Sequence, residues 1–225
     1  MNKVAVIVAG GTGTRMQTTQ PKQFLLVQGK PLLYYTLKQF LEAFEDLKII
    51  LVLPEEFMAA GQEIIDAWFG YDQIQLTEGG RTRFHSVQNG LKLVTDEAIV
   101  FVHDGVRCFP GVDLIRRCYQ QALELGSAIP AIACKDSVRL MQPDGNEAID
   151  RQLIRLVQTP QTFHSKILLP AYQIDYKEKF TDEATVVEAF GMKVYLIEGE
   201  DRNIKITHPT DLLIAEKLLE EVNLS

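Results

Sequence analysis

The residues with the clearest chemical potential follow a short apolar run near the start of the chain. There the sequence reads VAGGTGTR, and Lys22 follows seven residues after Arg15. Glycine lets backbone N–H groups approach an oxyanion closely, and successive N–H groups form a phosphate-binding nest. A guanidinium offers a planar fork, and an ammonium offers a compact point charge. We therefore expect residues 8–24 to bind phosphate, against the plainer alternative of a tight turn after a strand.

The glycine spacing differs from two familiar nucleotide-binding motifs. A dinucleotide fingerprint, G-x-G-x-x-G, would need glycine at Met16, and a P-loop would need Gly-Lys-Ser or Gly-Lys-Thr at the required spacing. In addition, no acidic residue follows the second expected strand in a convincing ribose-binding position. An NAD-dependent oxidoreductase is therefore disfavoured.

The overall composition excludes several other classes of protein. The chain has 225 residues, 46% of them hydrophobic, and a formal net charge of −7, so it can bury a sizeable core and has no general nucleic-acid surface. We expect no membrane partner, because no segment is apolar enough to span a bilayer. The three cysteines and four scattered histidines match no zinc or redox pattern, which favours reduced thiols and a cytoplasmic location.

Strand-like and helix-like segments alternate along the first 134 residues. We expect strands at 4–9, 48–53, 73–77, 98–104 and 127–134, and helices at 31–44, 55–69, 82–94 and 112–125. This alternation predicts an α/β fold with parallel strands and helices on both faces of the sheet. Ligands bind beyond the carboxyl ends of such strands, so the segments after the first, fourth and fifth strands are expected to share one site.

Residues 135–158 break this pattern, and we call them the arm. They are rich in charge, alternate weakly and contain a Pro-Asp-Gly turn signal at 143–145, which predicts a hairpin. A lone two-stranded hairpin is marginally stable in water, so we expect it to pack on a second copy of the chain; a loose surface hairpin is the alternative. Helices are expected at 164–174, 182–190 and 209–222, with a strand at 192–199. The whole chain, 1–225, is interpreted as a single domain with an arm.

The ordered motifs of the chain resemble those of a known enzyme family. They are AGGTGTRM, PKQF, EGGRTRFHSV, HDGVR, KDS, QTPQTF, TDEA and NIKIT. Together they resemble the 2-C-methyl-D-erythritol 4-phosphate cytidylyltransferases, over nearly the whole chain. The resemblance implies a Rossmann-like three-layer nucleotidyltransferase fold with a mostly parallel sheet and a protruding β-arm. It also implies transfer of CMP from CTP to methylerythritol phosphate, with release of pyrophosphate, in isoprenoid precursor biosynthesis.

The resemblance assigns roles to individual residues. Arg15, Lys22 and Lys205 would be catalytic, through contacts with the reacting phosphates. The nucleotide would be bound by Gly10, Gly11, Gly79, Gly80, Ser86 and Asp104. The acceptor would be bound by Arg107, Ser137, Arg151 and Thr181, with the arm of one copy reaching the site of the other in a homodimer. Mg²⁺ would be held mainly through the CTP phosphates, with Asp104 as the candidate protein ligand.

Several of these residues also have a purely structural interpretation. Arg107 could simply pair with Asp104 at a strand end, Ser86 could be an ordinary polar residue in a helix, and Thr181 could be a helix N-cap. Arg151 could lie on a solvated arm surface. Lys205 stands among apolar residues, where a bare ammonium is costly, and this favours a functional role.

The chain also departs from the family pattern at a few positions. Ser137 stands where threonine is common, Cys108 stands where proline is common, and Arg81 stands where an acidic or small residue is common and is assigned no role. His103 is interpreted as structural and Cys108 as a buried filler. Two other functions stay open: a ribitol-5-phosphate cytidylyltransferase, and a nucleotide-binding regulator without catalytic activity.

Overall fold

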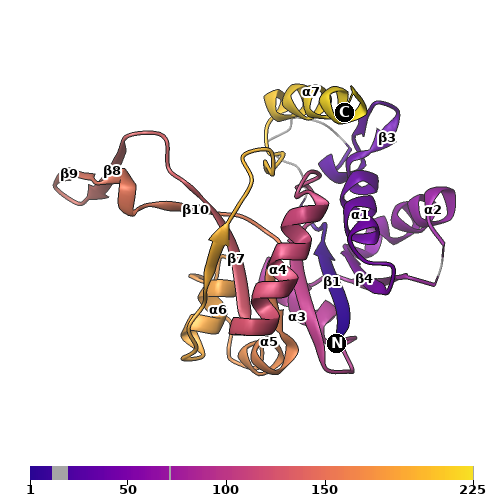
Figure 1. The fold of residues 1–225 in the computed structure, drawn as a ribbon, viewed down its shortest axis with the longest axis horizontal. Coiled ribbons are helices and arrows are strands. Elements are labelled where there is room, and N and C mark those ends of the chain that lie inside the picture. The colour runs from indigo at the N-terminus through magenta and orange to yellow at the C-terminus, as the bar shows by residue number, and fades with distance from the viewer. Residues whose placement is uncertain (12–19, 71, 225) are drawn as a thin grey trace.

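The computed structural model describes residues 1–11, 20–70 and 72–224, and within that part of the chain eight strands form the main sheet (Figure 1). Its order is β10-β7-β11-β6-β1-β4-β5, with β12 paired to β7. The strands are β1 (Asn2–Val8), β4 (Leu47–Leu53), β5 (Ile74–Glu78), β6 (Ala98–Asp104), β7 (Ser127–Ala133), β10 (Arg155–Val157), β11 (Gln161–His164) and β12 (Leu196–Glu198).

The centre of the sheet is parallel. β1 pairs in parallel with β4 and β6, and β4 pairs in parallel with β5. The register sets Val8 opposite both Val52 and Asp104, so the carboxyl ends of these strands lie at one edge. β11 runs antiparallel between β6 and β7, which leaves β6 and β7 pointing the same way. The residues that follow the parallel strands therefore meet along one edge of the sheet.

Helices cover both faces of the sheet, which gives the three layers that the sequence predicted. One hydrophobic cluster joins alternate residues of β1, β4 and β6 to α1 (Leu32–Ala43), α2 (Met58–Trp68) and α4 (Val112–Leu125). The other joins the opposite residues of these strands to α3 (Arg83–Leu91), α5 (Ser165–Ala171) and α6 (Glu183–Ala189). Strands buried on both faces explain why these segments are almost continuously apolar.

The chain ends in α7 (Pro209–Leu224), which lies across the edge of the sheet near the small hairpin of β2 (Leu26–Val27) and β3 (Lys30–Pro31) (Figure 1). The sequence predicted α7 but not this hairpin. The short 3-10 helix η2 (Lys22–Phe24) was also not predicted, whereas η3 (Glu55–Phe57) lies at the start of the helix predicted over 55–69. No helix within the described ranges is long and apolar enough to cross a membrane.

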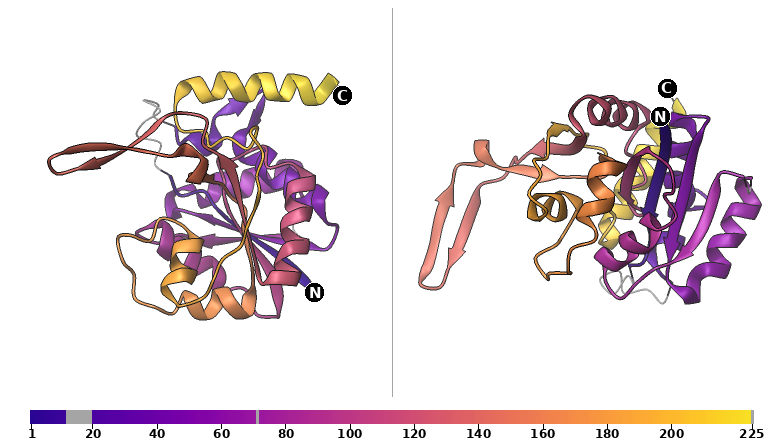
Figure 2. Two further views of the ribbon diagram at one scale, coloured as in Figure 1. Left: turned by 60° about the vertical axis from the view of Figure 1, so that its left-hand side comes forward. Right: turned by 90° about the horizontal axis from the view of Figure 1, so that it is seen from below.

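The arm projects away from the body of the molecule, as Figures 1 and 2 show. Its protruding part is the antiparallel pair β8 (Val138–Gln142) and β9 (Gly145–Ile149), joined at the predicted Pro143–Asp144 turn. The expected hairpin over 135–158 is too long, because the chain turns through η4 (Arg151–Leu153) and rejoins the sheet as β10. The protruding part of the arm is therefore a short two-stranded ribbon.

Two further expectations need correction after the arm. β11 was not predicted, and the helix expected at 164–174 is α5, which ends at Ala171. The strand expected at 192–199 is only the three residues of β12. β11 carries the polar residues Gln161 and Thr162, and strands with buried polar residues lack the apolar run by which a central strand is recognised.

Candidate active site

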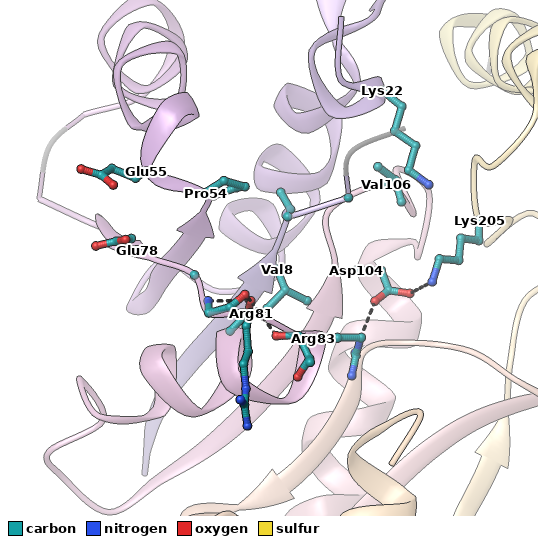
Figure 3. A pocket seen from close by; sticks show the side chains of 17 residues that line it. Val8, Lys22, Pro54, Glu55, Glu78, Arg81, Arg83, Asp104, Val106 and Lys205 are labelled. Atoms are coloured by element: carbon teal, nitrogen blue, oxygen red, sulfur yellow. Dashed lines mark hydrogen bonds and ion pairs between the residues drawn. The ribbon is translucent and has the colours of Figure 1, made fainter. Parts of the chain in front are cut away.

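A cavity of about 640 Å³ opens at the carboxyl edge of the sheet (Figure 3). The ends of four parallel strands line it, through Gly10 and Gly11 after β1, Pro54 and Glu55 after β4, Gly79 and Gly80 after β5, and Asp104 at the end of β6. Lys22 and Lys205 approach it from the same side, as Figure 3 shows. The structure thus brings together eight of the predicted site residues, including Ser86, from positions almost 200 residues apart in sequence.

The glycine loop after β5 is built around Ser86. The Gly80 N–H donates to Ser86 Oγ over 3.0 Å, and that hydroxyl donates to the Thr82 carbonyl over 3.0 Å. Thr82 is the N-cap of α3, where its side chain accepts from the His85 N–H. A Cβ at Gly80 would lie 2.5 Å from the Cβ of His85, so only glycine fits there. Ser86 is therefore both a wall of the cavity and the support of the loop.

Lys22 is held in place by the segment PKQF, which forms η2. Its Nζ donates to the Ile206 carbonyl over 3.1 Å, across 184 residues of sequence. The next residue, Gln23, is fully buried and donates through Nε2 to the Ala9 carbonyl over 2.7 Å. These two bonds fix the ammonium beside Gly11, whose Cβ position lies 3.4 Å from Lys22 Cε. Arg15, the other predicted catalytic cation of this loop, lies outside the described residues.

Asp104 is surrounded by cations. Its carboxylate pairs with Arg83 Nε at 3.1 Å, Lys205 Nζ at 2.9 Å and Arg107 Nε at 3.7 Å. Burial opposes ionisation of this carboxyl group, but the neighbouring Arg83 and Lys205 outweigh burial and hold its pKa well below the usual range. The site therefore keeps a fixed negative charge within a group of positive ones.

The environment of Lys205 differs from the expected one. The sequence suggested an ammonium buried among apolar neighbours, but the Lys205 side chain is 43% exposed and rests on Asp104. The apolar neighbour Ile206 is fully buried instead. Since an exposed ammonium on one carboxylate can swing to another anion, Lys205 is available to a phosphate in the cavity.

Arg83 is the main site residue that the sequence analysis missed. Its Nη1 and Nη2 donate to the two carboxylate oxygens of Glu183 at 2.5 and 3.1 Å, while its Nε reaches Asp104. Tyr172 also donates to Glu183, over 3.0 Å. Glu183 raises the pKa of Arg83 further, against the opposing effect of burial. The only sequence signal was a second arginine in RTRF, next to the glycines.

The predicted acceptor residues lie outside this cavity. Arg107 donates to the Asn203 carbonyl over 2.7 Å and pairs with Asp104, which is the structural interpretation that the sequence left open. Thr181 is exposed and is not the N-cap of α6; Asp182 is, in a capping box with Thr185. The cap interpretation of Thr181 was therefore wrong.

The two predicted acceptor residues of the arm, Ser137 and Arg151, do not line the cavity. Ser137 and Arg151 are exposed, and Arg151 donates to the Lys135 carbonyl over 2.7 Å. Arg81, to which the sequence assigned no role, lies on the wall of the cavity.

His103 and Cys108 are structural, as predicted. His103 is fully buried between the Arg107 carbonyl at 2.8 Å and the Thr159 hydroxyl at 3.0 Å, and burial lowers its pKa to about 4. Burial raises the pKa of the Cys108 thiol to about 12. Neither group is suited to accept a proton from a substrate or to attack one near neutral pH.

The cavity offers backbone amides and cations, which are groups that bind phosphate. A metal would find few carboxylates: within the described ranges no three His, Cys, Asp or Glu side chains gather closely enough to hold an ion. Glu55 and Glu78 lie at the other end of the cavity from Asp104 and Lys205 (Figure 3). The arrangement therefore suits an anionic ligand with several phosphate groups better than a protein-held metal.

Comparison with known proteins points to one family. The family model described as 2-C-methyl-D-erythritol 4-phosphate cytidylyltransferase matches residues 3–221. A relative of that name from Bacteroides fragilis is 46% identical over 220 residues, which cover 97% of this chain and 100% of the relative. Another from Phocaeicola vulgatus is 44% identical over 219 residues, with coverage of 97% and 100%.

Solved structures agree with the sequence comparison. The crystal structure of 4-diphosphocytidyl-2C-methyl-D-erythritol synthase from Anaerococcus prevotii has a TM-score of 0.83 at 29% identity, over 97% of this chain and 96% of that one. The structure of 2-C-methyl-D-erythritol 4-phosphate cytidylyltransferase from Thermus thermophilus has a TM-score of 0.72 at 30% identity, over 96% and 98%. Fold and sequence therefore lead to the same group of proteins.

Proposed function

The chain belongs to the 2-C-methyl-D-erythritol 4-phosphate cytidylyltransferase family, and from this premise we propose how its residues perform the reaction. It is a nucleotidyltransferase that transfers CMP from CTP to 2-C-methyl-D-erythritol 4-phosphate, giving 4-diphosphocytidyl-2-C-methyl-D-erythritol and pyrophosphate. This reaction is a step in the formation of isoprenoid precursors. The observation that carries the assignment of the site is the glycine-lined cavity with Lys22 and Lys205 at one end.

The chemical obstacle is repulsion between two anions. The acceptor phosphate attacks the α-phosphorus of CTP, and each pair of unit charges about 4 Å apart repels by on the order of 4 kcal/mol at an effective dielectric near 20. Cations held in place before the reaction remove this barrier, because they need no rearrangement as charge moves. Lys22 and Arg15 would bind the triphosphate, and Lys205 would move from Asp104 to the reacting phosphates.

No general base takes part in this mechanism. A phosphate monoester has its second pKa near 6, so the nucleophilic oxygen is already ionised at neutral pH. The buried His103 fits this picture, because its ring nitrogens are both engaged and its pKa is lowered to about 4 by burial. The backbone at Gly10, Gly11, Gly79 and Gly80, with Ser86, positions the nucleotide.

Magnesium would be held mainly by the CTP phosphates. The side chains fit this division, because Asp104 is the carboxylate that pairs with Lys205 among the described residues, and it is already paired with further cations. Asp104 would contact the ion once Lys205 has turned to the phosphates. A bound magnesium ion neutralises phosphate charge and stabilises the leaving pyrophosphate.

The acceptor side of the site would be completed by a second copy of the chain. Arg107 and Thr181 would bind the acceptor from one copy, and Ser137 and Arg151 would bind it from the arm of the other. Exposed apolar side chains on the arm support such a dimer: Met141 is 75% exposed and Leu153 is 79% exposed. Apolar side chains at these positions are unfavourable in water and favourable in an interface.

The dimer is tested by sedimentation of Met141→Asp. We expect the wild type to sediment as a dimer and the variant as a monomer with little turnover. A matched control is Leu213→Asp on α7, which also replaces an exposed leucine, 63% exposed, but lies away from the arm. A wild-type monomer, or a Met141→Asp dimer as tight as wild type, would remove the arm from the proposal.

The function is tested by pyrophosphate release from CTP with two acceptors side by side. With Mg²⁺, we expect release with methylerythritol phosphate and little with ribitol 5-phosphate, and no release without an acceptor. Faster release with ribitol 5-phosphate would overturn methylerythritol phosphate as the acceptor, and nucleotide binding without pyrophosphate release would indicate a regulator.

A cytoplasmic location is also proposed, since all three cysteines are free thiols, as expected in a reducing compartment.

A further inference from the structure

We propose that the ion pair between Arg83 and Glu183 couples nucleotide binding to acceptor binding. Both are positioning residues: Arg83 acts through the glycine loop, and Glu183 acts through the segment that holds Thr181. The inference rests on the proposed function, because it takes the cavity as the nucleotide site and Thr181 as part of the acceptor site.

The two residues stand at equivalent places on two helices. Arg83 is the first residue of α3 and follows the Gly79–Gly80 loop, while Glu183 is the first residue of α6 and follows Thr181 by two positions. Their bidentate contact, at 2.5 and 3.1 Å, therefore joins the starts of the two helices directly. A bidentate pair fixes orientation as well as distance, so the Gly79–Gly80 loop before α3 and the Thr181 segment before α6 cannot tilt independently.

A second contact makes this link rigid. Tyr172, 1% exposed, donates to Glu183 over 3.0 Å, and its ring stacks on Phe84 with centroids 4.8 Å apart. Phe84 is the neighbour of Arg83 in sequence. Glu183 is thus linked to the start of α3 directly, by its ion pair with Arg83, and indirectly, through Tyr172 stacked on Phe84.

The charges explain why the link responds to the nucleotide. Arg83 spans Asp104 and Glu183, and Asp104 also pairs with the exposed Lys205. Phosphates in the cavity compete with Asp104 for Lys205, which leaves Asp104 more dependent on Arg83 at 3.1 Å and on the more distant Arg107 at 3.7 Å. The guanidinium, and with it the start of α6, is then held in a single position.

Coupling of this kind is reciprocal, so it is measured as one ratio. The ratio is the dissociation constant of a non-reacting CTP analogue, with a methylene group between the α- and β-phosphorus, without and with methylerythritol phosphate. We expect a ratio of at least about 5 for the wild-type dimer, within the usual range of coupling. In Arg83→Met and Glu183→Gln we expect it to fall to within about 2-fold of unity.

A purely structural role predicts a different result. Arg83→Met leaves the buried Glu183 without the cation that the structure records beside it, so the variant loses thermal stability. Arg83→Met/Glu183→Gln removes that unpaired charge, so stability recovers towards wild type while the ratio stays near unity. If the ratio recovered together with stability, or if a folded Arg83→Met kept the wild-type ratio, the coupling role would be refuted.

Two further measurements complete the test. Arg117→Met removes an arginine–glutamate pair of similar length, 2.8 Å to Glu200, outside the cavity, and should keep the wild-type ratio. Arg83→Lys keeps the charge without the fork and should give an intermediate ratio. A wild type that releases no pyrophosphate with methylerythritol phosphate refutes the proposed function. An active wild type with a ratio of unity refutes the coupling alone.

Discussion

Replacing Asp104 with asparagine tests the electrostatic account of the site. The change keeps the shape of the side chain and removes one negative charge that three cations share. At an effective dielectric near 20, unit charges 2.9 and 3.1 Å apart attract by roughly 5–6 kcal/mol each. Desolvation of the buried groups offsets most of this attraction, and removing one partner of a buried pair costs about 3–5 kcal/mol net.

Two features of the structure narrow that range. Lys205 is 43% exposed, so its pair with Asp104 is screened by solvent and contributes less. Arg83 keeps its second partner, Glu183, in the variant. We therefore expect Asp104→Asn to lower the free energy of unfolding by about 3 kcal/mol, which lowers Tm by roughly 6–12 °C in a chain of this size.

The dependence on pH gives an independent check. The pKa of Asp104 is lowered in the folded state, so its contribution is complete above the unfolded pKa near 3.9 and is lost as pH falls towards the folded pKa. The difference in Tm between wild type and Asp104→Asn should accordingly shrink below about pH 4. The measurement is calorimetry or circular dichroism from pH 7.5 to pH 3.

Asp46→Asn is the matched control for this comparison. Asp46 pairs with Lys3 at 2.7 Å, closer than any contact of Asp104, but it is 67% exposed. We expect its loss to cost under about 1 kcal/mol. A loss of stability in Asp104→Asn no larger than in Asp46→Asn, or a difference in Tm from wild type that stays unchanged between pH 4 and pH 3, would refute the reasoning.

Three further predictions concern the glycine loop, the catalytic lysine and the buried histidine. Lys22→Ala should lower kcat by roughly 100- to 1000-fold at nearly unchanged Tm, as steady-state kinetics would show; near-normal turnover would remove Lys22 from catalysis. Ser86→Ala leaves the Gly80 N–H without its acceptor, so KM for CTP should rise roughly fivefold, and an unchanged KM would contradict the support role. His103 has a folded pKa of about 4, below its unfolded value of 6.5, so its protonation on unfolding lowers stability as pH falls from 6.5 to 4. The loss reaches about 3 kcal/mol, and His103→Gln should lack this part of the pH dependence in acid titrations of stability.

The central strands and most helices could be predicted because their sequences carry a local signal. The strands at the parallel centre are buried on both faces and read as apolar runs, and the helices α1 and α4 follow a clear apolar period. β11 gives no such signal. Its Gln161 is buried because the side chain donates to Asp182 and accepts from the Ala184 N–H, and those partners are about 20 residues away in sequence.

The site shows the same division between local and distant information. The glycines, Lys22 and Asp104 could be found because each follows a strand, and the topology of a parallel sheet gathers such residues. Arg83 could not be found, since its meaning depends on Glu183, which lies 100 residues further along the chain. Lys205 was found for the wrong reason, because its apolar neighbour Ile206 is buried in a separate cluster while the Lys205 side chain is 43% exposed on Asp104.

The bond from Lys22 to the Ile206 carbonyl has a consequence for synthesis of the protein. Residues from Val8 to Lys205 line one cavity, so a nascent chain still on the ribosome has the first half of its binding site long before the second. The segment with Gly10 and Gly11 is synthesised almost 200 residues before Lys205, which lines the same cavity. Capacity to bind substrate is therefore acquired only after Lys205 has been synthesised, long after the glycine segment.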